Sequence, residues 1–224
     1  PECEGINMDA TVTSILHKSQ EELEMLARKK VKHLYLGIES GLDDVLKFMK
    51  KDHDLAQAYQ AIDRLHGAGL IYDAHIMTGV AGKGRGMENA EALAQFLNRT
   101  NPAHVVNFSM FLHKEVPLYQ DIRQGTFVPA DELETIREEY HLIERIAPEK
   151  AGANILYDGF HDFIHVRVRG HLPGDKEKML AKLNGIIQEY EGKEPVYSFV
   201  QGECPDLEYC DDGKAVWDMD RKTS

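Results

Sequence analysis

A carboxylate and a hydroxyl follow directly after a short apolar run, in a position where they could bind a ligand. The run covers residues 34–38, and Glu39 and Ser40 come next. Apolar runs of this length, bounded by turn residues, are typical of buried strands. Apolar residues then recur at helical spacing over 42–49, and two aspartates stand in the first turn, where the helix dipole favours acids. In parallel α/β folds, ligands bind at such a junction of strand and helix.

Two histidines in or after other predicted strands are candidates for acid–base or substrate contacts. Asp73 and His75 lie two residues apart on the predicted strand 71–78, so they share one face and could act as an orienting carboxylate and a base. A histidine within a strand is also commonly a buried core residue, and that alternative stays open. His113 follows the predicted strand 104–112, at the edge where barrel enzymes place active residues.

The histidines and cysteines do not form a metal-binding pattern. Three histidines between residues 161 and 171 have spacings of four and six. These spacings put them on no single face of a helix or strand, and no carboxyl-rich stretch accompanies them. Cys3, Cys204 and Cys210 are too few for an auxiliary iron–sulfur cluster, which needs about four thiolates. Their odd number and wide separation also argue against a disulfide framework, so a cytoplasmic location is expected.

Strands and helices alternate along most of the sequence. A capping box of Ser19 and Glu22 opens one helix, Asp54 caps another, and an amphipathic helix over 130–146 carries charges that we expect to be solvated. This alternation predicts an α/β fold, with a parallel sheet and helices outside it. The predicted strands are 5–10, 34–38, 71–78 and 104–112, and the other predicted helices are 42–49, 54–67, 87–98 and 179–190.

The junction at Glu39 resembles the corresponding part of a known family. Residues 37–41 (Gly-Ile-Glu-Ser-Gly), followed by Lys51, are similar to the fourth strand and following helix of the radical S-adenosylmethionine (SAM) superfamily. The likeness is greatest to the branch that includes oxygen-independent coproporphyrinogen oxidases and elongator-type enzymes. It implies that Glu39 and Ser40 contact the ribose or the methionyl amine of SAM. It also implies that Lys51 pairs with the SAM carboxylate through a charge-assisted bond.

Other segments extend the resemblance over most of the chain. Gly79 and Gly82 lie in a loop similar to the family loop whose backbone contacts adenine, because small residues let a flat ring approach the main chain. The resemblance also places Gly37, Asn7 and Asp9 among the cofactor-binding residues.

The C-terminal part resembles the end of a poorly characterised radical SAM subgroup, in which a histidine precedes an Arg-Gly-x-Leu-Pro stretch. His161 and Arg169 match that pattern and become candidates for substrate contacts. The superfamily's cysteine motif CxxxCxxC is absent from the sequence. We therefore expect the C-terminal portion of a longer protein. Residues 1–148 would form a partial (β/α) TIM-like barrel, about strands three to six of six, and 149–224 a C-terminal extension and tail.

The resemblance implies that the intact protein binds SAM and carries an N-terminal [4Fe-4S] cluster whose ligands are not in this chain. An electron from a reductant such as flavodoxin or ferredoxin would cleave SAM to a 5′-deoxyadenosyl radical, which abstracts hydrogen from a small-molecule substrate. This chain alone is expected to be inactive. Two alternatives stay open: a barrel lyase or aldolase that uses Asp73 and His75 with a metal, and a non-catalytic barrel fragment that serves as an interaction module.

Composition excludes some partners. The 26 basic and 38 acidic residues give a formal charge of −12. Nucleic-acid surfaces need clustered Lys and Arg, so a nucleic-acid partner is not expected. No apolar run reaches the length of about eighteen residues that spans a bilayer, so a membrane partner is not expected either.

Overall fold

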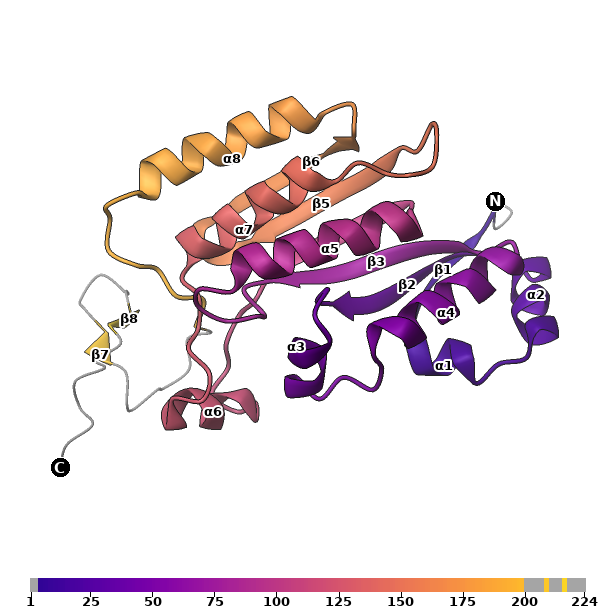
Figure 1. The fold of residues 1–224 in the computed structure, drawn as a ribbon, viewed down its shortest axis with the longest axis horizontal. Coiled ribbons are helices and arrows are strands. Elements are labelled where there is room, and N and C mark those ends of the chain that lie inside the picture. Colours follow the sequence, from indigo (N-terminus) through magenta and orange to yellow (C-terminus); the bar gives the residue numbers. More distant parts are fainter. Residues whose placement is uncertain (1–3, 200–207, 210–214, 217–224) are drawn as a thin grey trace.

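Six strands form the main sheet of the computed structural model, which describes residues 4–199, 208–209 and 215–216 (Figure 1). The strands pair in chain order; β1 to β5 are parallel to one another, and β6 is antiparallel to β5. The predicted α/β class is confirmed, as an open sheet compatible with part of a TIM-like barrel. The strands are β1 (Ile6–Ala10), β2 (Val31–Glu39), β3 (Ile71–Thr78), β4 (His104–Ser109), β5 (Ile155–His161) and β6 (Val166–Leu172), with a separate pair, β7 (Glu208–Tyr209) and β8 (Ala215–Val216).

A layer of helices covers one face of this sheet, and the hydrophobic core lies between the sheet and this layer (Figure 1). Strand residues such as Leu36, Ile76 and Val105 are fully buried there against apolar side chains of α4, α5 and α7. Each of these helices has an apolar stripe at a spacing of three and four residues, which faces the sheet. The helices are α1 (Val12–Leu16), α2 (Gln20–Arg28), α3 (Asp43–Phe48), α4 (Leu55–Gly67), α5 (Gly86–Thr100), α6 (Leu118–Gln124), α7 (Glu132–Arg145) and α8 (Lys176–Tyr190), with a 3₁₀ turn at Asp162–Ile164.

The opposite face of the sheet carries polar and aromatic side chains. Successive side chains of a strand point to opposite faces, so Tyr35, His75, Phe108 and Phe160 lie opposite the core. All four are partly exposed, and Phe108 is 36% exposed. We call this surface, formed by the side chains that alternate with the core residues of β1 to β6, the open face.

Most local predictions agree with the structure, but several elements, α1 among them, were not foreseen. The predicted strand 71–78, the capping box at Ser19 and the helix cap at Asp54 are confirmed. β6 and α6 were not predicted; β6 alternates valines with arginines and completes a hairpin with β5. Because β5 also pairs with β4, the sheet continues across residue 148, where the sequence suggested a division.

Three glutamates of α7 are buried rather than solvated. Glu132 and Glu138 are 1% exposed and Glu139 is 0% exposed. The prediction of a solvated charged face is wrong at these positions. Each carboxylate accepts hydrogen bonds from the sheet or from a loop beside it, which compensates part of the cost of burying charge.

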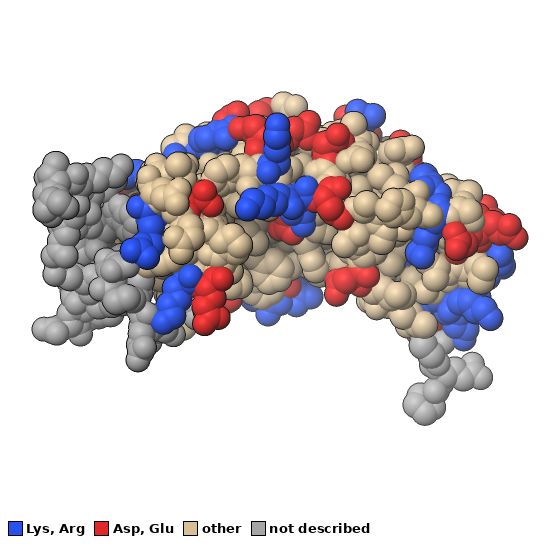
Figure 2. Space-filling model, turned by 90° about the horizontal axis from the view of Figure 1, so that it is seen from below, with Lys and Arg blue, Asp and Glu red and all other residues tan. Residues whose placement is uncertain are grey.

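The molecular surface carries both signs of charge. On the face shown in Figure 2, acidic and basic side chains are interspersed and form no continuous basic area among the described residues. No helix in the described part of the chain is long and apolar enough to cross a membrane.

Candidate functional site

An ion pair marks the end of β2. The Lys51 Nζ atom lies 3.2 Å from the Glu39 Oε1 atom, and the two side chains are 28% and 24% exposed. Gly37 lies directly beneath them: a Cβ atom there would be 2.9 Å from Glu39 Oε1 and 3.3 Å from Lys51 Nζ. The sequence resemblance pointed to these three residues, and the structure brings them together. Both charged groups remain accessible to a small ligand.

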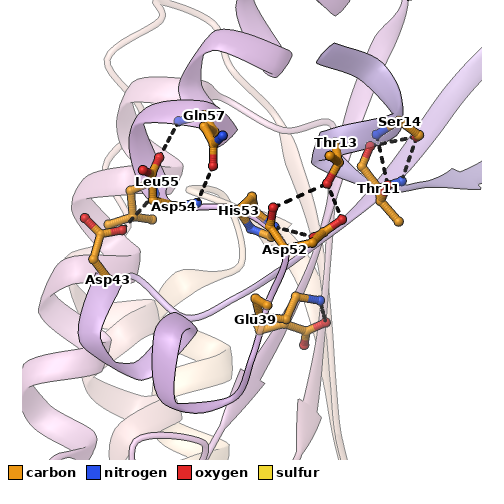
Figure 3. A network of polar contacts seen from close by, with 11 residues as sticks. Thr11, Thr13, Ser14, Glu39, Asp43, Asp52, His53, Asp54, Leu55 and Gln57 are labelled. Atoms are coloured by element: carbon orange, nitrogen blue, oxygen red, sulfur yellow. Dashed lines mark hydrogen bonds and ion pairs between the residues drawn. The ribbon is translucent and has the colours of Figure 1, made fainter. Parts of the chain in front are cut away.

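Side-chain hydrogen bonds fix the segment that carries Lys51 (Figure 3). The Asp52 carboxylate accepts a hydrogen bond from the Thr13 hydroxyl and lies 3.2 Å from His53 Nδ1. The Asp43 carboxylate in α3 accepts a 2.8 Å hydrogen bond from the backbone N–H at the start of α4. These contacts tie the connection between α3 and α4 to both helices and to the residues after β1, so the position of the lysine is built into the fold.

Ser40 faces the interior rather than a ligand site. Its hydroxyl is fully buried, donates a 2.6 Å hydrogen bond to Asn89 Oδ1 and accepts one from the Leu42 backbone N–H. The predicted SAM contact of Ser40 does not fit this placement, because both hydrogen-bonding directions of the hydroxyl are engaged inside the chain. Ser40 instead holds the corner that follows Glu39.

A buried carboxylate connects this corner with the glycine loop after β3. Glu138 Oε1 accepts a 2.7 Å hydrogen bond from Asn89 Nδ2, and Glu138 Oε2 accepts a 2.8 Å hydrogen bond from the Gly79 backbone N–H. Burial raises the pKa of Glu138 to about 7, although the hydrogen bonds from Asn89 and Gly79 lower it. Sequence reasoning missed Asn89 and Glu138, because nothing local to either residue indicates a partner so far away in the chain.

The two glycines predicted to contact adenine are required by the backbone of the loop. Gly79 has φ +81° and Gly82 has φ +80°, in the region that favours glycine. A Cβ atom on Gly79 would meet Thr135, and one on Gly82 would meet the Val128 carbonyl oxygen at 3.0 Å. Gly82 also lines a cleft of about 360 Å³ between the loop and α3, which includes Phe48. Glu39 and Lys51 do not line this cleft.

Asp73 and His75, the orienting carboxylate and base of the lyase alternative, have different partners in the structure. Asp73 Oδ2 lies 2.6 Å from His33 Nδ1, so the hydrogen-bond partner of Asp73 is His33 and not His75. Burial raises the pKa of Asp73, while the hydrogen bond with His33 lowers it. The His75 ring instead contacts the rings of Tyr35 and Phe108. The Asp73–His75 arrangement expected for a lyase is therefore not formed.

Asn7 and Asp9 lie on the exposed edge strand β1. In the parallel register Asn7 pairs with His33, and Asp9 pairs with Tyr35, four residues before Glu39. Their side chains therefore share the open face with those partners, but below the level of the Glu39–Lys51 pair.

His113 and His161 lie in different surroundings. His113 follows β4 in a loop, is 36% exposed, and accepts a 3.2 Å hydrogen bond from the Glu115 backbone N–H. His161 is fully buried on the helix side of the sheet, where Nδ1 lies 3.0 Å from Glu132 and Nε2 lies 3.1 Å from Glu139. Burial lowers the pKa of His161, but these two hydrogen bonds outweigh it and raise the pKa to about 10. This placement does not fit the expected substrate contact of His161.

The burial of Glu139 on the core side could have been predicted from the sequence. It stands three residues after Ile136 and four before Ile143, so helical spacing alone puts its carboxylate on the buried stripe of α7. A buried carboxylate needs a charged or hydrogen-bonding partner, and the structure supplies His161, Asn107 and Tyr157.

The described residues provide no metal centre. No group of three or more His, Cys, Asp or Glu side chains among them is arranged to hold a metal ion. Cys3, Cys204 and Cys210 lie outside the described residues. The described residues therefore do not fit an iron–sulfur cluster.

Comparisons with known proteins agree with the fold and with the superfamily resemblance over part of the chain. A family model for the Radical SAM superfamily matches residues 2–97, a segment that contains Glu39, Lys51, Gly79 and Gly82. The predicted resemblance to that superfamily is confirmed over this segment, which is less than half of the chain. No curated protein matches the sequence.

A solved structure shares the fold. Elp3 of the archaeon Methanocaldococcus infernus, with its N-terminal residues 1–46 deleted, is similar with a TM-score of 0.61 and 17% sequence identity. The match covers 84% of this chain and 42% of that chain. At this identity the likeness concerns the fold alone, and the chain spans less than half of the structure that it matches.

Proposed function

We propose that this chain is the SAM-binding part of a radical SAM enzyme that acts on a small molecule. The observation that carries the proposal is the half-buried Glu39–Lys51 pair above Gly37, inside the segment that matches the superfamily model. SAM, when bound with an iron–sulfur cluster whose cysteines stand outside these 224 residues, would supply radical chemistry. The residues of this chain would bind and orient SAM.

The charges of the pair are complementary to the methionyl end of SAM. An amino acid carries one ammonium and one carboxylate, so its ammonium can take the place of Lys51 beside Glu39, and its carboxylate can take the place of Glu39 beside Lys51. The two side chains now face each other at 3.2 Å, so the ligand would separate them and replace their contact with two of its own. Gly37 supports this role because any side chain at that position would fill the space beneath the pair.

The rest of SAM would extend toward the loop after β3. We place the adenine near Gly82, which lines the cleft between this loop and α3, whereas Gly79 holds the loop through its bond to Glu138. Ser40 has no direct ligand contact in this proposal, because its hydroxyl is engaged with Asn89.

Titration calorimetry with SAM tests the proposal on this chain directly. We expect Glu39→Gln and Lys51→Met each to weaken SAM binding about tenfold, since each removes a charge-assisted hydrogen bond. The matched controls are Glu24→Gln and Arg28→Gln, which alter an exposed ion pair on α2 and should leave the affinity unchanged. Equal affinities in the Lys51→Met variant and the unaltered chain would contradict the proposal.

The cluster requires a test on the longer coding sequence. If the residues encoded upstream of Pro1 contain CxxxCxxC, anaerobic reconstitution with iron and sulfide should give a protein that converts SAM to 5′-deoxyadenosine. An upstream sequence without such cysteines would contradict the enzymatic part of the proposal and favour a non-catalytic interaction module.

A further inference from the structure

A row of aromatic rings crosses the open face and ends at a guanidinium group. The ring centroids of Tyr35 and His75 are 5.0 Å apart, those of His75 and Phe108 are 5.9 Å apart, and those of Phe108 and Phe160 are 5.8 Å apart. The Arg167 guanidinium carbon then lies 4.7 Å from the centroid of the Phe160 ring. Five adjacent strands, β2 to β6, each contribute one member of this row.

The register of the sheet makes this row continuous and directs it toward one edge. Gly37 of β2 pairs with His75, Met77 of β3 pairs with Phe108, and Phe108 pairs with Phe160. The row therefore climbs from the middle of β2 toward the carboxyl ends of β4 and β5. Those are the strand ends on the side where β2 ends in Glu39, so the row reaches the same end of the sheet as the proposed SAM site.

The arginine end of the row has an excess of positive charge. Arg167 binds Asp158 through Nε at 2.8 Å and Nη2 at 2.7 Å, and Arg169 Nε lies 3.6 Å from the same carboxylate. Two guanidinium groups thus share one carboxylate. Both arginines are about half exposed, at 51% and 54%. Within the described part of the chain, Nη1 of Arg167 makes no hydrogen bond, which leaves a donor for an anionic ligand.

We infer that the open face binds a small planar aromatic anion. Its ring would lie against the exposed part of Phe108, whose ring stacks on that of Phe160 with an interplanar angle of 17°, and its carboxylate or phosphate would be bound by Arg167 and Arg169. A formal charge of −12 and only two clustered arginines favour a small anion over a long polyanion. This substrate class rests on the proposed function, because the open face serves as a substrate site only beside bound SAM.

Binding of 2-naphthoate to the full chain without SAM tests this inference. Naphthalene fluorescence and amide NMR shifts report the affinity and the location, and the uncharged 2-naphthamide is the matched probe. We expect naphthoate to bind at least about tenfold more tightly than the amide, with shifts in β4 and β5, since the anion gains charge-assisted hydrogen bonds. Naphthamide binding with the same affinity would overturn the inference, and so would the absence of naphthoate binding.

Substitutions in the aromatic row test whether naphthoate binds there. Arg167→Gln and Phe108→Leu should each weaken naphthoate binding, Arg167→Gln by about tenfold. The controls are Arg137→Gln on the helix layer and Phe111→Leu, an exposed phenylalanine that takes no part in the ring contacts of the row. If Arg167→Gln disturbs folding by circular dichroism, the Phe108→Leu variant on the central strand β4 decides. Equal binding in both row variants and the unaltered chain would overturn the inference.

The same measurements separate this inference from the SAM proposal. Glu39→Gln should weaken SAM binding but leave naphthoate binding unchanged. SAM binding without naphthoate binding would overturn the substrate class alone, and naphthoate binding without SAM binding would contradict the proposed function alone. A single-stranded oligonucleotide that binds far more tightly than naphthoate, with an affinity that rises with its length, would also overturn the choice of a small molecule.

Discussion

At the scale of single residues, the end of β2 contains an uncommon backbone conformation. Glu39 has φ +63°, in the left-handed region that non-glycine residues adopt rarely and at a cost of about 1 kcal/mol or more. The same residue carries the carboxylate that meets Lys51 above Gly37. A costly conformation beside a half-buried ion pair is consistent with a position maintained for ligand binding, because neither feature contributes to the hydrophobic core.

Replacing Gly37 by alanine tests the space beneath the pair. The atoms nearest to the added methyl group would be the ends of the flexible Glu39 and Lys51 side chains, at 2.9 and 3.3 Å, so the strand should tolerate it while the pair is displaced. We expect SAM affinity to fall about tenfold and the free energy of unfolding to change by less than about 1 kcal/mol. Calorimetry and urea unfolding measure the two quantities.

Gly185→Ala is the matched control for this substitution. Gly185 lies within α8, and a Cβ atom there would meet nothing within 4 Å. This variant should keep its SAM affinity and gain helix stability, since glycine is a poor helix former. Unchanged SAM affinity in Gly37→Ala would show that the pair does not need the space beneath it.

At the scale of elements, α7 carries the carboxylates that fix the sheet and the glycine loop. Glu132 and Glu139 hold His161 of β5 from both ring nitrogens, and Glu138 holds the backbone of Gly79. α7 is therefore both part of the core layer and the element that positions the loop after β3. Buried polar networks of this kind specify one arrangement of the elements, because each unmatched group would be costly.

The His161 network predicts a pH-dependent stability. The pKa of His161 is about 10 in the folded chain against an ordinary value of 6.5, so folding favours the protonated ring. This stabilisation is fully present below pH 6.5 and is lost as the pH rises toward 10, by up to about 1.4 kcal/mol per pH unit. Urea unfolding between pH 7 and 9.5 measures it. Glu138, with a pKa of about 7, changes the pH dependence of stability mainly below this pH range.

The His161→Gln variant tests whether His161 causes this pH dependence of stability. It should be less stable than the unaltered chain at pH 7, since it leaves Glu132 and Glu139 without a cation. The difference in stability between the two proteins should shrink as the pH rises to 9.5. A difference that stays constant over this range would show that the ring is not protonated in the folded chain.

At the scale of the whole molecule, the sheet has two edges in the described chain, β1 and β6. β1 pairs only with β2, and its core-side residues Ile6 and Met8 are 41% and 43% exposed. An edge strand with exposed apolar side chains offers unpaired backbone groups to another chain. The open sheet also exposes the aromatic row that would lie inside a closed barrel.

We expect this chain to self-associate through β1 at high concentration. Sedimentation velocity should show a monomer that gives way to larger species as the concentration rises. Met8→Lys should suppress them, because a charge on an edge strand opposes pairing. Met87→Lys, at an exposed methionine in the first turn of α5, is the control and should leave association unchanged. A monomer at all concentrations would contradict the prediction.

The sequence by itself determined the α/β class, the boundaries of β3 and the helix caps at Ser19 and Asp54. These features depend on local periodicity and capping chemistry, both of which are written in neighbouring residues. The assignment of Glu39 and Lys51 to one site came from the family resemblance.

Only the tertiary structure decided which distant groups meet. It paired Asp73 with His33 instead of His75, connected Gly79 to Glu138, and turned His161 toward the helices. It also placed the ring row and Arg167 on one face, because the register and direction of β5 and β6 are set by pairing across the sheet. Such pairings depend on contacts between residues far apart in the chain, for which a single sequence contains no local signal.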